Sequence, residues 1–158
     1  MVYPAVRAYA DKHFPAPNGA ELGGETAARL KELLADSKHY RACIHPDTGV
    51  KDIDAALRAI HLFDASVTQP YLLNLLEYRA QANIGDDAVA TVLWTLDTYL
   101  FRRWVCGVPA NALNKVFETL HGDVLRGVEE GAKYEEVVKY ILTHKGGQSR
   151  LPDRKSVV

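Results

Sequence analysis

The residues best suited to chemistry in this sequence stand close together, in the stretch YLFRRWVCGVPANALNKVF at positions 99–117. Arg102 and Arg103 offer two adjacent positive charges, and Cys106 offers a thiol. Guanidinium groups bind carboxylates, phosphates and backbone carbonyls. A thiol reacts only where its surroundings lower its pKa, so Cys106 is expected to be a small buried hydrophobic residue. The chemistry that this stretch predicts is therefore binding, with no catalytic residue.

Polar residues follow the two arginines after a glycine and a proline. Asn111, Asn114 and Lys115 lie at the start of the next expected helix, where free backbone N–H groups can bind an anion. Together with Arg102 they are candidates for contact with phosphate, DNA or a neighbouring domain. Asparagines at such positions also commonly cap helices, which is the alternative interpretation.

The helix that carries the arginines must point them in different directions, because successive residues are rotated by about 100°. Arg103 falls within an apolar arc, whereas Arg102 falls on the other side with Thr95 and Thr98. The apolar arc consists of Val89, Val92, Leu93, Leu96 and Leu100. Arg103 is therefore expected to be buried, and Arg102 to lie on a polar side.

A buried unpaired charge costs several kcal/mol, so Arg103 needs a carboxylate or several backbone carbonyls. Asp64, Glu77 and Asp97 lie on or near apolar helix faces and are the candidate carboxylates. We predict a structural buried ion pair between Arg103 and one of these residues that fixes the helix register.

Apolar residues recur at helical spacing along most of the chain, and no segment alternates with period two over the length of a strand. The pattern predicts an all-α fold, a single bundle-like domain of about seven helices. We expect a leading helix at 1–14, a linker rich in proline and glycine at 15–24, a helical core at 25–146 and a polar tail without a folded ending at 147–158. The abrupt ends favour a fragment of a larger multidomain protein, the alternative being a small protein with frayed ends.

Composition limits the classes of function. The 19 basic and 20 acidic residues give a formal net charge of -1, without the basic excess of an autonomous nucleic-acid binder. Two distant cysteines and six scattered histidines make no zinc-type spacing, although His39 and Cys43 would share a helix face. No nucleotide-binding, P-loop or nucleophile-elbow motif occurs. We expect no metal, no cofactor and no membrane segment, and a cytoplasmic location.

The arginine stretch resembles the helical segment of GmrSD-type, modification-dependent restriction proteins. In those proteins, an aromatic-x-x-Arg-Arg-x-x-Cys-Gly element precedes an Asn-x-x-Asn-Lys-x-Phe helix. The matching positions are Tyr99, Arg102, Arg103, Cys106, Gly107, Asn111, Asn114, Lys115 and Phe117. The upstream ALRAIHLFDASVTQPYLLNLLEYRAQANI and the terminal RLPDRKSV are also similar to that arrangement.

The resemblance implies a middle helical region between a ParB-like nucleotidase domain and a His-Asn-His nuclease domain. Neither domain's motif occurs here, so no catalytic residue is carried over. We expect a scaffold that is not itself an enzyme, within an NTP-dependent endonuclease used for DNA restriction or phage defence. Its expected partners are the flanking domains and DNA. The alternative is a stand-alone protein-interaction module with an apolar groove near Trp94, Phe101 and Trp104, although burial in the core would also explain these residues.

Overall fold

The computed structural model describes Ala8, Lys12 and residues 22–63 and 66–152. All regular structure in these residues is helical, which confirms the predicted all-α fold. The α-helices are α2 (Leu22–Ile44), α3 (Lys51–His61), α4 (Gln69–Ala80), α5 (Asp86–Val105), α6 (Leu113–Glu129) and α7 (Tyr134–His144). Three short 3₁₀-helices are η1 (Ser66–Thr68), η2 (Ala110–Ala112) and η3 (Gly147–Ser149). None of the described helices has the length and apolar character needed to cross a bilayer.

The chain divides into two compact units, residues 1–38 and 39–158. In the first unit, the predicted leading helix at 1–14 lies outside the described residues apart from Ala8 and Lys12, as does the linker up to residue 21. Helix α2 begins at Leu22, so the last three residues of the predicted linker are helical instead. Its exposed surface carries an ion pair between Arg29 and Glu32, with 2.8 Å between nitrogen and oxygen.

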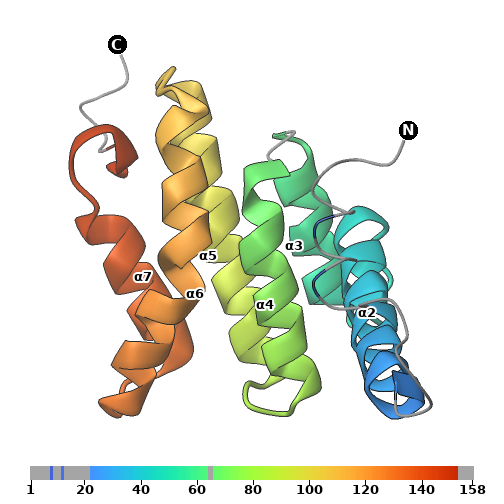
Figure 1. Cartoon of the computed structure of the whole chain (residues 1–158). Coiled ribbons are helices and arrows are strands. Elements are labelled where there is room, and N and C mark those ends of the chain that lie inside the picture. Colours follow the sequence, from blue (N-terminus) through green and yellow to red (C-terminus); the bar gives the residue numbers. More distant parts are fainter. Residues whose placement is uncertain (1–7, 9–11, 13–21, 64–65, 153–158) are drawn as a thin grey trace. The chain divides into compact units, whose positions relative to one another are not determined.

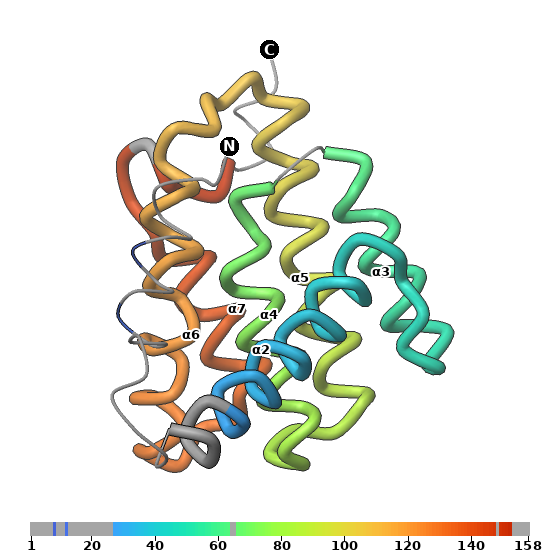
Figure 2. Tube along the Cα trace, turned by 45° about the vertical axis from the view of Figure 1, so that its right-hand side comes forward, coloured from blue at the N-terminus to red at the C-terminus, as the bar shows by residue number. Residues whose placement is uncertain are grey.

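The second unit contains the end of α2 and the helices α3 to α7. Helix α5 packs against α3 and α7, and α6 packs against α4 and α7. Figure 1 shows α3 to α7 standing side by side, and the turned view in Figure 2 keeps α5 between α3 and α7. Helix α5 is therefore the element that positions the arginine stretch.

Helix α5 buries the predicted face. Its five apolar positions between Val89 and Leu100 are buried, and Arg103 continues that buried arc, as predicted. The helix ends at Val105, and Gly107, two residues later, has a φ of 62°, the left-handed conformation that glycine adopts without steric cost. The amides of Gly107 and Val108 bond to the carbonyls of Trp104 and Arg103 at 3.1 and 2.9 Å. These bonds close the helix directly after the two arginines.

The start of α3 is fixed by a buried carboxylate. The backbone amide and the hydroxyl of Thr48 both donate to Asp54 Oδ1, at 2.8 and 2.7 Å. Burial alone would raise the pKa of Asp54, but the two hydrogen bonds from Thr48, together with the positive charges of Arg58 and Arg79, lower it overall. The turn before α3 is thereby tied to the first turn of that helix.

Candidate functional site

Arg103 joins three separate segments of the second unit. Only 2% of its surface is exposed. Its Nη2 donates to the carbonyl of Pro109 at 2.8 Å, and its Nη1 donates to the carbonyl of Arg150 at 3.1 Å. The guanidinium carbon also lies 5.4 Å from the centre of the Tyr99 ring, within the range of a cation–π contact. Arg103 thus holds α5, the α5–α6 connection and the carboxy-terminal segment together.

Of the two kinds of partner expected for Arg103, backbone carbonyls are present, whereas the predicted ion pair is not formed with either candidate carboxylate that the structure describes. No ion pair joins Arg103 to Asp97 or Glu77 within the described residues. Asp97 lies six residues before Arg103, which puts the two side chains about 120° apart around α5. Glu77 is exposed and accepts a hydrogen bond from Gln81. Asp64, the third candidate, lies outside the described residues.

The first part of the predicted polar tail is ordered on the core, contrary to expectation. Tyr99 donates its hydroxyl to the carbonyl of Ser149 at 2.6 Å. Leu151 packs against the core, and Pro152 is buried. The hydrogen bonds from Tyr99 and Arg103 therefore fix residues 149–152, here called the carboxy-terminal segment, against α5. Residues 153–158 of the predicted tail lie outside the described part of the chain.

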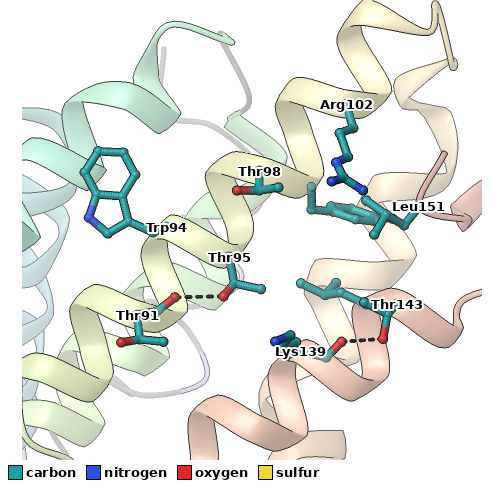
Figure 3. Close-up of a pocket in the computed structure, with 10 residues that line it drawn as sticks. Thr91, Trp94, Thr95, Thr98, Arg102, Lys139, Thr143 and Leu151 are labelled. Atoms are coloured by element: carbon teal, nitrogen blue, oxygen red, sulfur yellow. Dashed lines mark hydrogen bonds between the residues drawn. The ribbon is translucent and has the colours of Figure 1, made fainter. Parts of the chain in front are cut away.

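A groove of about 530 Å³ lies between α5 and α7, here called the α5–α7 groove, and Leu151 lines it too. Its size is typical of a ligand-binding pocket. Figure 3 shows Arg102 beside Leu151 and Lys139 on the opposite helix. The lining residues are Thr91, Trp94, Thr95, Thr98, Tyr99, Arg102, Lys139, Leu142, Thr143 and Leu151.

The lining combines an apolar centre with two positive charges. Thr91 and Thr95 donate their hydroxyls to carbonyls four residues earlier, each at 2.8 Å, and Thr143 does the same. Because these donors are already used, the threonines offer mainly methyl groups and acceptor oxygens. In the described part of the chain, Arg102 and Lys139 form no ion pair, and no carboxylate lines the groove. The α5–α7 groove is suited to an anionic ligand with an apolar part.

The other predicted contact residues do not line this groove. Asn111, Asn114 and Lys115 are exposed on η2 and the first turn of α6. The alternative interpretation, in which the asparagines cap helices, is wrong, because Pro109 and Ala112 occupy the two cap positions. The predicted DNA or interdomain contact of Arg102, Asn111, Asn114 and Lys115 stays a prediction.

Large apolar side chains are exposed along one side of α5. Trp94, Phe101, Trp104 and Val105, here called the aromatic face, are 43%, 51%, 69% and 44% exposed. The Phe101 ring contacts Phe63 edge to face, with 6.4 Å between centroids. Burial in the core, the interpretation that the sequence left open for the three aromatic residues, is therefore wrong.

The cysteines and histidines of the described residues give no reactive cluster. Burial raises the pKa of the Cys43 thiol to about 11, so this cysteine is protonated at neutral pH. Cys106 is partly buried at the end of α5, where full burial was expected. In the described part of the chain, no three His, Cys, Asp or Glu side chains are grouped as metal ligands.

His121 lies in an aromatic cluster between α4, α6 and α7. Its Nδ1 is 2.9 Å from the Tyr134 hydroxyl, and its ring contacts those of Tyr71, Tyr78 and Tyr134. Burial lowers the pKa of His121, and Glu77 opposes this effect only in part. The folded chain therefore favours the neutral imidazole.

We expect the pKa of His121 to make stability depend on pH. Below the ordinary histidine pKa of about 6.5, the unfolded chain binds a proton that folded His121 resists, so the free energy of unfolding falls as pH drops through and below this value. Urea unfolding between pH 7.5 and 5.5 measures the loss. In His121→Gln the loss should be smaller, whereas His144→Gln, at an exposed position, should keep the original pH dependence. Equal pH dependence in all three proteins would contradict the assignment.

Sequence reasoning found Arg102 and Arg103, named Tyr99 only as a position of the resemblance, and missed Lys139 and Leu151. Thr91, Thr95 and Arg102 are spaced so that they share one side of a helix, and this pattern could have indicated the α5 wall of the groove. The other wall depends on how α7 and the carboxy-terminal segment pack, which no local pattern reveals.

Comparison of the sequence with protein-family models gave no match, and the same holds for curated proteins and for solved structures.

Proposed function

We propose that this chain is a non-catalytic helical scaffold that docks a neighbouring protein domain through the aromatic face of α5. The exposure of Trp94, Phe101 and Trp104 on one helix carries the proposal. Aromatic residues are enriched in the buried centres of protein interfaces, where they contribute most of the binding energy.

The aromatic face continues onto the residues that directly follow helix α3. Phe101 touches Phe63, and the adjacent Leu62 is 85% exposed. A contiguous exposed apolar surface of this kind is typical of a contact site. Docking of another domain there would remove several large side chains from water at once.

The resemblance to GmrSD-type proteins suggests what that neighbour is. We propose a flanking domain of the same, longer cytoplasmic polypeptide, in which this chain is the middle region of a DNA restriction or phage-defence protein. Exposure of Arg102 and Lys115 is compatible with an added DNA contact. The protein contact is the better supported role, because the aromatic face gathers on one helix, whereas only Arg102 of the predicted DNA-contact residues lines the α5–α7 groove.

Hydroxyl-radical footprinting tests the docking of a flanking domain. We would oxidise the isolated chain and the endogenous polypeptide that carries it, and quantify oxidation at individual side chains by mass spectrometry. Phe101 and Trp104 should be oxidised several-fold more slowly in the endogenous polypeptide. Tyr140 is a matched control, because it is an aromatic residue 63% exposed on α7, away from the aromatic face.

Two results would contradict the proposal. Equal oxidation of Phe101 and Trp104 in both forms would show that no flanking domain covers the aromatic face. An endogenous polypeptide of only 17.5 kDa, the mass of this chain, would leave no flanking domain and would favour the stand-alone interaction module.

A further inference from the structure

We propose that the α5–α7 groove binds an acidic peptide segment with apolar side chains between its carboxylates. The proposal rests on the proposed function, because it names the chemistry of a protein segment that the scaffold holds. The groove and the aromatic face share Trp94, but neither Phe101 nor Trp104 lines the groove.

The charge of the groove selects an anionic occupant. Arg102 on α5 and Lys139 on α7 line it. Among the described residues, no carboxylate lines it, and neither cation is ion-paired. Both side chains are exposed and need no displacement of an internal partner. A ligand carboxylate therefore gains a charge-assisted hydrogen bond at either position.

The apolar centre of the groove selects against a bare phosphate. Leu142 is buried, Leu151 is half-buried, and the Tyr99 hydroxyl is already bonded to Ser149. A phosphate site needs several donors that converge on one point. Here the two cations come from different helices, and Figure 3 shows the apolar Leu151 beside Arg102. Separate carboxylates on either side of an apolar residue fit this arrangement better.

The length of the groove suits a short peptide. Thr91 and Arg102 both line it, and eleven residues of α-helix separate them by about 16 Å. This length corresponds to about five residues of extended chain. Leu151 of the carboxy-terminal segment lines the groove. This segment is held against α5, because Tyr99 and Arg103 donate hydrogen bonds to the carbonyls of Ser149 and Arg150. The site is therefore formed before the ligand arrives.

Peptide display on the full chain tests the proposal across many ligand sequences at once. The probe is a library of random peptides of about twelve residues, selected on the immobilised chain. We expect enrichment of peptides with Asp or Glu on both sides of apolar residues. In Arg102→Glu/Lys139→Glu, affinity for these peptides should fall by about tenfold or more. Amide NMR signals of Thr95, Thr98 and Thr143 should shift when a selected peptide is added to the unaltered chain.

The matched control is Lys115→Glu/Lys133→Glu, which changes the net charge by the same amount at two exposed lysines outside the groove. It should keep the affinity within about twofold, because neither lysine lines the groove and both charges are exposed to solvent and screened by salt. The proposal is overturned if no acidic peptides are enriched, if both double variants weaken binding equally, or if a phosphate-bearing oligonucleotide binds the groove and the acidic peptides do not. Phe101→Ser, which adds no charge beside Arg102, should leave peptide binding intact, so failure at the aromatic face and failure at the groove are distinguishable.

Discussion

Replacement of Arg103 by methionine should lower the free energy of unfolding by about 2–3 kcal/mol, the largest effect that we expect from a single substitution outside the apolar core. Methionine fills much of the space but donates no hydrogen bond, so the carbonyls of Pro109 and Arg150 lose their charged donor. The contact with the Tyr99 ring is lost as well. Urea unfolding followed by circular dichroism measures the change, and the Tm should fall by about 5–10 °C.

The neighbouring arginine provides the control. Arg102 is exposed and forms no described ion pair, so Arg102→Met should change the free energy of unfolding by no more than about 0.5 kcal/mol. Tyr99→Phe should cost about 1 kcal/mol, because it removes only the hydrogen bond to Ser149. If Arg102→Met destabilised the chain as much as Arg103→Met, the role assigned to Arg103 would be wrong.

Substitution of Gly127 by alanine should destabilise the chain by about 1–3 kcal/mol. A Cβ atom at this position would lie 2.8 and 2.9 Å from the two γ carbons of Val137, closer than carbon atoms can approach. Valine is stiff and cannot turn away cheaply, so α6 and α7 must separate. Thermal unfolding compared with the unaltered chain measures the loss.

Substitution of Gly122, on the same helix, is the control that measures the effect of glycine on helix propensity without a steric clash. A Cβ atom there meets nothing within 4 Å, so Gly122→Ala should stabilise the chain by about 0.5–1 kcal/mol through higher helix propensity. The pair Gly127→Ala and Val137→Ala should together cost less than the sum of the two single changes, because removal of the valine methyl groups relieves the contact. Strict additivity would show that the two helices are not in close contact at this point.

The features that the sequence predicted correctly are those that depend on neighbours along the chain. The buried arc of α5 follows from a spacing of three and four residues, and its end follows from Gly107. The direction of Arg103 followed from the same rotation per residue. These patterns determine which face a helix buries, whatever lies against that face.

The partners of Arg103 could not be predicted in the same way. One of them, the carbonyl of Arg150, belongs to a residue 47 positions later in the chain. Every residue has a carbonyl group, so the sequence marks no single one as a partner, whereas carboxylates are few and stand out as candidates. The α5–α7 groove was missed for a related reason, because its walls meet only after α7 and Leu151 are packed.

The aromatic face illustrates a further limit. Apolar residues occur nearly all round α5, so periodicity alone cannot say which of them lie in the core. The packing of α3 and α7 decides this, because it covers one part of α5 and leaves Trp94, Phe101 and Trp104 exposed.

The positions of the two tryptophans have a spectroscopic consequence. The chain contains only Trp94 and Trp104, and both indole rings are in contact with water on the surface of a single helix. Their fluorescence spectrum should therefore resemble that of the unfolded chain and report little of the melting of the core. The same exposure makes the emission sensitive to any molecule that covers this side of α5. Binding of a partner there should shift the emission maximum to shorter wavelength, whereas unfolding of the core should change it little.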